Sequence, residues 1–183
     1  GWVAHPDDDL WDSTKAALQT LMASFTGDVS DIRGIGLCSI RCCRVFMNRD
    51  GSLAAPVMSW MDIRAYAPFE DDPGIGYTGS TSGYLTFRLT GELKDTIANS
   101  YPAQFPVDMN TWTWSEVPDV LSAFRIPRAK LLDMGLPGEI LGRVSATAGS
   151  RPSLSCLRTT RSAPSRRSSG GSATQCPTPT SWC

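Results

Sequence analysis

The sequence predicts a mixed α/β fold, because one helical pattern precedes three short β-like runs and another helical segment follows them. Apolar side chains recur at three- and four-residue spacing over residues 10–25, which is typical of a helix with one buried face. The β-like runs lie at residues 35–38, 42–47 and 53–58, and a further helix is expected after residue 115. This order predicts helices packed on a small sheet.

The first helix has recognisable signals at both ends. Asp7, Asp8 and Asp9 precede the apolar pattern, where carboxylates favour the positive end of the helix dipole. Gly27 follows the pattern and is expected to form the C-terminal cap. The helix is therefore predicted to pack its apolar face against the core.

The second and third β-like runs are separated by Asn48-Arg49-Asp50-Gly51. Asp and Gly tolerate the positive φ that a tight hairpin requires, so this stretch predicts a turn. Pro56 is compatible with the third strand only where its missing N–H is not needed by the ladder. The second helix is expected to begin with Ser115 as its N-cap.

Length and composition are those of a single globular domain with a tail. The chain has 183 residues, a formal net charge of −1 and 6 cysteines, too few and too clustered for a disulfide scaffold. We find neither a membrane-spanning apolar stretch nor a signal pattern, so we expect a cytoplasmic protein without membrane partners. The oligomeric state cannot be read from the sequence.

Metal binding is not favoured by the sequence. Cys38, Cys42 and Cys43 lack the second cysteine pair of a structural zinc site, and cysteines beside β-strands are usually small buried hydrophobic residues. His5 is the only histidine, and a single histidine before a helix is more often a capping or surface residue than a base. No metal ligand is therefore assigned in this chain.

Three residues after the third β-like run suggest a binding site. Trp60, Asp62 and Arg64 alternate along the chain, so in extended geometry their side chains would point to one face. A ring, a carboxylate and a guanidinium on one face can stack on, accept from and donate to a polyhydroxylated ligand. The alternative is an Asp–Arg pair that caps a sheet edge beside a core tryptophan.

Several phrases of the sequence occur together, and in the same order, in one family. They are I-G-L-C-S-I-R at 35–41, N-R-D-G at 48–51, P-V-M-S-W-M-D-I-R at 56–64, Y-L-T-F-R-L-T-G at 84–91, I-P-R-A-K-L at 126–131 and P-G-E-I-L-G at 137–142. Together they resemble the sugar-pocket region of the FGGY carbohydrate kinases, which include glycerol, xylulose, ribulose and gluconate kinases. The resemblance covers about residues 1–148.

The resemblance implies a fold and an activity. FGGY kinases have a two-domain fold of the ribonuclease-H-like (actin/hexokinase) type and use ATP and Mg²⁺ to phosphorylate a sugar or polyol hydroxyl. Residues 1–148 would be an incomplete N-terminal, sugar-binding domain of this type. The phrase at 84–91 would be a short helix that ends at Gly91.

The resemblance also implies a set of substrate-binding residues. They are Arg41, Cys42, Trp60, Asp62, Arg64 and Asp95. Cys42 replaces a residue that is commonly polar or charged in the family, and Ile40 stands where many relatives have Gln, so the sugar that fits stays open. Asp95 either borders the sugar pocket or acts as a helix N-cap.

Parts of the catalytic machinery would lie outside this chain. Family members begin with a strand and a D-x-G-T phosphate loop, whereas this sequence starts at the following helix, and the catalytic aspartate is not present. We therefore assign no catalytic residue and expect the isolated chain to be inactive as a kinase. The alternative function is a non-catalytic sugar-binding or scaffolding remnant.

The composition changes abruptly near residue 149. Residues 151–183 contain 8 Ser, 5 Thr, 5 Arg and 4 Pro, so residues 149–183 are predicted to form a disordered low-complexity tail. Five arginines without interleaved aromatic residues make a poor nucleic-acid-binding module, and no nucleic-acid partner is expected. Because the family continues with a Gly-Leu-Pro phrase here, we interpret the tail as the product of a shifted reading frame, which the coding DNA would test.

Overall fold

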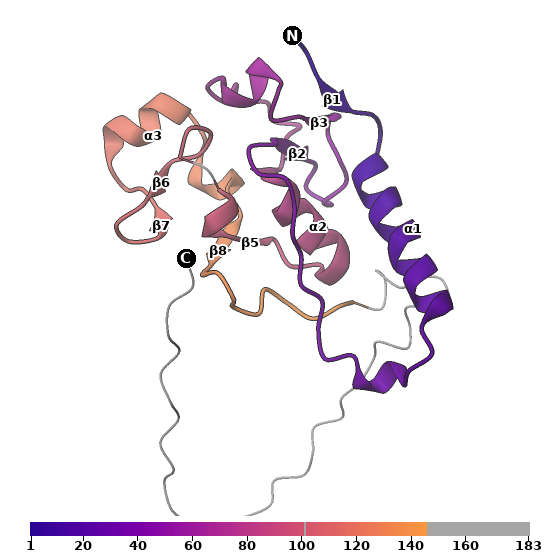
Figure 1. Cartoon of the computed structure of the whole chain (residues 1–183). Coiled ribbons are helices and arrows are strands. Elements are labelled where there is room, and N and C mark those ends of the chain that lie inside the picture. Colours follow the sequence, from indigo (N-terminus) through magenta and orange to yellow (C-terminus); the bar gives the residue numbers. More distant parts are fainter. Residues whose placement is uncertain (101, 146–183) are drawn as a thin grey trace, which may run out of the picture.

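The structure of the chain is a computed structural model that describes residues 1–100 and 102–145. It is a mixed α/β arrangement in which short strands form a sheet and helices cover it (Figure 1). The predicted tail at 149–183 lies outside the described residues. Among the residues described, no helix is both long enough and apolar enough to cross a membrane.

The strands pair in four sets of two. β1 (Ala4–His5) pairs antiparallel with β3 (Val57–Met58), and β2 (Val45–Met47) pairs antiparallel with β4 (Tyr77–Gly79). β5 (Lys94–Thr96) runs parallel to β8 (Asp133–Gly135). β6 (Val107–Asp108) and β7 (Thr113–Trp114) form a separate antiparallel hairpin.

Two isolated bridges connect three of these pairs into one row. Arg44 pairs antiparallel with Met58, which joins β2 to β3, and Thr78 pairs in parallel with Leu131, which joins β4 to the segment entering β8. The row is therefore β1-β3-β2-β4-β8-β5. In this row β3, β4, β5 and β8 run in one direction, while β1 and β2 run in the other.

This order gives the sheet one edge at which β3, β4, β5 and β8 end and β1 and β2 begin. We call it the carboxyl edge. In α/β sheets, ligands usually bind outside the carboxyl ends of the parallel strands. The carboxyl edge is therefore where a ligand is expected.

The described residues form three α-helices beside the strands. α1 (Asp9–Ser24) lies beside α2 (Thr81–Thr90), and α3 (Pro118–Phe124) lies near the β6–β7 hairpin (Figure 1). Short 3₁₀ turns occupy Val29–Asp31, Ile63–Tyr66, Ile97–Asn99 and Arg128–Lys130. The predicted helices at 10–25 and 84–91 are thus confirmed to within two or three residues.

The core consists of two clusters of buried side chains. The first joins α1, α2 and the β2–β4 strands; its members are Trp11, Cys43, Val45, Met47, Val57, Tyr84, Leu85, Leu89 and Leu132. The second lies around the β6–β7 hairpin; its members are Phe69, Ile97, Phe105, Val107, Trp114, Ile126 and Leu131. The two clusters meet at the segment entering β8, which contributes Leu132 to the first and Leu131 to the second.

Some end signals were read wrongly from the sequence. α1 ends at Ser24 with Phe25 as its C-cap, and Gly27 instead leaves room for the Phe25 ring, since a Cβ at residue 27 would lie 2.7 Å from that ring. α3 begins at Pro118 rather than after Ser115. The Ser115 hydroxyl accepts a hydrogen bond from the Val117 N–H at 3.2 Å, so it orders the approach to the helix.

The three predicted strands are shorter than expected. No strand forms at residues 35–38, and residues 53–56 join the hairpin only through an isolated bridge between Leu53 and Met47. The turn between the second and third runs is confirmed, with the Gly51 N–H donating to the Asn48 carbonyl at 3.0 Å and a φ of 82° at Gly51. The regular part of the hairpin is thus only a few residues long.

Candidate functional site at the carboxyl edge

The carboxyl edge gathers the predicted site residues from distant parts of the sequence. Arg41 and Cys42 immediately precede β2, and Trp60 to Arg64 immediately follow β3. Asp95 lies in β5, at the far end of the row of strands. Because Arg44 and Met58 form an antiparallel bridge, the residues before Arg44 and those after Met58 lie at the same edge.

Asp62 and Arg64 form a tight ion pair. The Arg64 Nε donates to one carboxylate oxygen of Asp62 at 3.0 Å and its Nη2 donates to the other at 2.6 Å. Asp62 is fully buried, and it also accepts from the Arg64 backbone N–H at 2.9 Å, which makes it the N-cap of the turn at 63–66. These hydrogen bonds, led by those from the Arg64 side chain, hold the pKa of the Asp62 carboxyl well below its usual range.

The expected geometry of Trp60, Asp62 and Arg64 was wrong in one respect. The segment is a turn followed by a 3₁₀ helix, not an extended strand, because the Asp62 carboxylate caps the backbone of the residues after it. Part of the alternative expectation is confirmed, since Asp62 and Arg64 do pair at the end of a strand. Trp60 is not a core residue, because half of its surface is exposed.

A further residue of this site was missed by sequence reasoning. The Arg64 guanidinium lies 4.3 Å from the centre of the Trp2 ring, and the neighbouring Val3 N–H donates to Asp62 at 2.8 Å. Trp2 is 78% exposed, so it lies on the surface beside the ion pair. Only the pairing of β1 with β3 brings residue 2 here, and no local pattern in the sequence signals that pairing.

Cys42 has an unusual backbone conformation. Its φ is 66°, in the left-handed region that non-glycine residues seldom adopt. The Cys42 carbonyl accepts a hydrogen bond from the Gln104 side chain at 2.6 Å, which fixes the direction of the chain at this point. Arg41, directly before it, is exposed. The bend therefore presents Arg41 at the carboxyl edge.

Asp95 occupies a buried polar network. Its carboxylate accepts from the Ser80 hydroxyl at 2.5 Å, from the Ser82 hydroxyl at 2.6 Å and from the Thr96 N–H at 2.7 Å. The side-chain amide of Asn99 donates to Ser82 at 2.8 Å. Burial raises the pKa of the Asp95 carboxyl above its usual value, against the opposing effect of these hydrogen bonds.

This network supports the start of α2. Ser80 is the N-cap residue of α2, but its hydroxyl donates to Asp95 and does not cap the helix. A carboxylate near a helix N-terminus is favoured by the helix dipole. Asp95 is only 1% exposed, so it lies behind the surface of the carboxyl edge.

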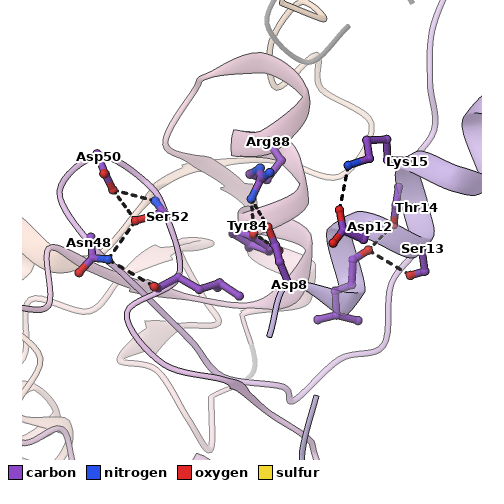
Figure 2. Close-up of polar contacts among 12 residues, drawn as sticks. Asp8, Asp12, Ser13, Thr14, Lys15, Asn48, Asp50, Ser52, Tyr84 and Arg88 are labelled. Carbon is purple, nitrogen blue, oxygen red and sulfur yellow. Dashed lines mark hydrogen bonds and ion pairs between the residues drawn. The ribbon is translucent and has the colours of Figure 1, made fainter. Parts of the chain in front are cut away.

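A hollow among the described residues lies elsewhere. A space of about 400 Å³ lies between the start of α1 and the segment before β3; it is lined by Asp7, Asp8, Ser52, Leu53, Ala54, Ala55, Pro56 and Arg88. Asp8 there bonds to Tyr84 and Arg88, and the neighbouring turn is closed by bonds among Asn48, Asp50 and Ser52 (Figure 2). Because these groups bond to one another and link α1 to α2, we interpret the hollow as structural.

The described residues contain no cluster of three or more potential metal ligands. Within residues 1–100 and 102–145, no three His, Cys, Asp or Glu side chains come together in a way that could hold a metal ion. Mg²⁺ bound with nucleotide phosphates is usually held by one or two carboxylates together with phosphate oxygens and water. The carboxyl edge offers a guanidinium, indole rings and an ion pair, which suit a polar ligand rich in hydroxyl groups.

Comparison with known proteins agrees with these features. No protein-family model matches the chain. The uncharacterized sugar kinase YgcE of Escherichia coli (strain K12) is 52% identical to it over 145 residues, which are 79% of this chain and 29% of that protein. The chain is therefore similar to a sugar kinase in sequence and spans less than a third of that kinase's length.

Solved structures of sugar kinases share its fold. The gluconate kinase from Lactobacillus acidophilus matches with a TM-score of 0.64 and 15% identity, over 86% of this chain and 39% of that one. The Plasmodium falciparum glycerol kinase, solved with ADP, matches with a TM-score of 0.61 and 16% identity, over 80% of this chain and 38% of that one. The fold prediction is confirmed: the chain has the mixed α/β fold of the actin/hexokinase type, and it spans only part of the kinases that share it.

Proposed function

We propose that this chain is the sugar-binding part of an FGGY-type carbohydrate kinase, an enzyme that transfers the γ-phosphoryl group of ATP to a sugar or polyol hydroxyl. The observation that carries the proposal is the 52% identity to a sugar kinase over 145 residues. The position of the predicted site residues at the carboxyl edge supports it, because ligands of α/β sheets bind at such edges.

The exposed groups at the carboxyl edge match the chemistry of a sugar. Arg41 supplies guanidinium donors for hydroxyl oxygens, and the half-exposed Trp60 ring can stack on the apolar face of a sugar ring. Arg64 keeps part of its side chain exposed while Asp62 holds it in place. Cys42 sets the bend that carries Arg41, and Asp95 supports the surface from behind through α2.

Phosphoryl transfer needs more than this surface. Catalysis depends on positioning the acceptor hydroxyl in line with the phosphate and on stabilising the charge of the phosphoryl group. When bound, Mg²⁺ and ATP supply the phosphoryl group and neutralise its charge. We assign their binding to parts of the kinase other than the described residues, and we assign to this chain the orientation of the sugar.

The proposal includes a cytoplasmic location. Cys38, Cys42 and Cys43 are free thiols, which fits a reducing compartment. A non-catalytic sugar-binding or scaffolding remnant of such a kinase is the second candidate, and it would use the same exposed groups at the carboxyl edge. The two candidates differ in whether a sugar bound at this surface is phosphorylated by ATP that is held elsewhere in the kinase.

Titration of the purified chain with glycerol, D-xylulose and D-gluconate tests the proposal. We expect at least one of them to change the tryptophan fluorescence in a saturable way, and Arg41→Ala to weaken that binding about tenfold or more, since hydrogen bonds to charged groups contribute about 1.5–3 kcal/mol. Arg49→Ala is the matched control, because Arg49 is exposed in the turn at the other end of β2.

Two results would contradict the proposal. Saturable binding of none of the three compounds would remove the sugar-binding role, as would equal weakening by Arg41→Ala and Arg49→Ala. A second arm adds ATP and Mg²⁺ and measures ADP release. We expect no sugar-dependent release from this chain alone, and release would show that the chain itself is a complete catalyst.

A further inference from the structure

Arg44 is a buried cation without an anionic partner among the described residues. It is 1% exposed, and across residues 1–100 and 102–145 no carboxylate lies within ion-pair distance of its guanidinium. Burial lowers the pKa of Arg44 to about 10. Placing a charge in the interior is unfavourable unless hydrogen bonds compensate for the lost hydration. The hydrogen bonds that Arg44 makes therefore indicate what its burial achieves.

Those contacts are almost all with backbone carbonyls. The Nη1 atom of Arg44 donates to the Ala67 carbonyl at 2.6 Å and lies 3.5 Å from the Ala65 carbonyl, while Nη2 donates to the Gln104 carbonyl at 3.4 Å. The guanidinium lies 5.7 Å from the centres of both the Phe46 and the Phe105 rings. Arg44 thus ties the start of β2 to the turn that follows β3.

Gln104 completes the same connection. Its side-chain amide donates to the Cys42 carbonyl at 2.6 Å and to the Ala65 carbonyl at 3.2 Å. These two bonds fix the orientation of the amide, and its oxygen lacks a protein partner, as does the Arg44 Nε. Gln104 is 1% exposed, so like Arg44 it cannot contact a ligand at the surface.

The two side chains join both halves of the candidate site. One half is the bend at Arg41 and Cys42, and the other is the turn that contains Asp62 and Arg64. The Ala65 carbonyl lies within reach of both Arg44 and Gln104, and the Cys42 carbonyl accepts a hydrogen bond from Gln104. The backbone pair of Arg44 and Met58 joins the adjoining strands, and these side-chain donors extend the connection to the bend at Cys42 and the turn at 62–67.

We propose that Arg44 and Gln104 are positioning residues that fix the Arg41–Cys42 bend relative to the Asp62–Ala67 turn, and so set the spacing of the donors that meet the sugar. The link to sugar binding rests on the proposed function. The mechanical link between the two segments does not. A buried guanidinium with its rigid, planar set of donors suits this role, because one side chain reaches several carbonyls at fixed angles.

Hydrogen exchange measured by mass spectrometry on the full chain tests the mechanical link. Gln104→Met keeps about the size of the side chain and removes its amide donors together with the unpaired amide oxygen, whereas Arg44→Lys keeps the charge and removes the planar fork. We expect both variants to speed exchange about tenfold or more in peptides covering residues 59–67, and to leave α2 unchanged. Arg88→Met is the matched control, because Arg88 also stacks on rings and links two elements, but links α1 to α2.

The outcomes separate the two claims. Exchange that rises equally in all peptides of Gln104→Met, or stays unchanged at residues 59–67, would overturn the positioning role. Where the wild type binds one of the three compounds, we expect Gln104→Met to raise its Kd about tenfold although Gln104 is buried, and an unchanged Kd would also overturn the role. Absence of binding by the wild type would contradict the proposed function alone, since the exchange pattern still decides the link between the segments.

Discussion

At the scale of single residues, the two buried aspartates at the carboxyl edge have opposite electrostatic environments. Asp62 is paired with a guanidinium, and the pKa of its carboxyl is lowered. Asp95 is surrounded by neutral donors, and burial raises the pKa of its carboxyl. The charged form of Asp62 therefore stabilises the fold, whereas the charged form of Asp95 destabilises it.

This contrast predicts opposite pH dependence for two variants. A carboxyl with a lowered folded pKa stabilises the fold above its unfolded pKa of about 3.9, and that stability is lost as the pH falls further. We therefore expect Asp62→Asn to be destabilised at pH 7, by a margin that shrinks below about pH 4. For Asp95 the sign is reversed: the wild type should gain stability relative to Asp95→Asn as the pH falls from 7 towards 4.

Urea denaturation between pH 3 and pH 7 measures both differences. Asp133→Asn is a suitable control, because the Asp133 side chain is 74% exposed and its variant should follow the wild type across the range. A constant difference between the wild type and Asp62→Asn down to pH 3 would show that folding does not lower the pKa of Asp62.

The sequence identified Asp62 and Arg64 as a pair but not what the pair does to the backbone. Alternation suggested a strand, whereas the carboxylate caps the following turn, and a cap is decided by which donors are near it in space. Arg44 and Gln104 gave no signal at all, because neither lies in a motif and their contacts span more than 20 residues. Sequence patterns indicate local periodicity and do not predict contacts between residues that are far apart in the sequence.

At the scale of elements, turns with positive φ fix the ends of β2 and α2. Gly91 has a φ of 80°, and its N–H donates to the Phe87 carbonyl at 2.7 Å, which closes α2. Gly51 has a φ of 82° in the hairpin turn, where an added Cβ would lie 1.9 Å from the Phe87 ring. Both glycines were predicted, since a left-handed cap and a tight turn have clear sequence signals.

The two positions predict different costs for the same substitution. Around Gly91 an added Cβ meets open space, so Gly91→Ala should lower the free energy of unfolding by only about 1 kcal/mol, the cost of the left-handed backbone. Gly51→Ala should cost more, because it adds a clash with Phe87. Gly36→Ala, at a site without positive φ or close neighbours, should change stability by less than about 0.5 kcal/mol.

Urea denaturation at neutral pH ranks the three variants. Equal losses for Gly91→Ala and Gly51→Ala would mean that the Phe87 ring moves aside without cost.

The strand lengths, in contrast to these turns, could not be predicted. The run at 35–38 is apolar enough for a strand, yet Ile35 is 37% exposed and the segment has no strand partner in the described chain.

At the scale of the whole molecule, α1 is attached to the rest through few contacts. Trp11 is its one buried residue, at 5% exposure, and the Arg88 guanidinium lies 4.8 Å from the centre of the Trp11 ring. At the start of the helix, Asp8 bonds to Tyr84 and Arg88 of α2 (Figure 2). The amphipathic pattern predicted that α1 packs on the core but not that one side chain dominates the contact.

This attachment predicts a large effect of one substitution. Trp11→Ala should lower the free energy of unfolding by about 3 kcal/mol, because removing a buried aromatic side chain leaves a cavity. Leu21→Ala on the same helix should cost less than about 0.5 kcal/mol, since Leu21 is 58% exposed. Chemical denaturation measures both, and similar losses for the two variants would show that α1 packs by its whole length.

The order of the strands also has a consequence for synthesis on the ribosome. β8 lies between β4 and β5, but it is translated after both of them. Until residues 131–135 emerge, the edges of β4 and β5 that will pair with the β8 segment are unpaired. Unpaired strand edges readily pair with other chains. Assembly is thus postponed to the end of translation of the described region, and this interval is when a growing chain most needs protection by chaperones.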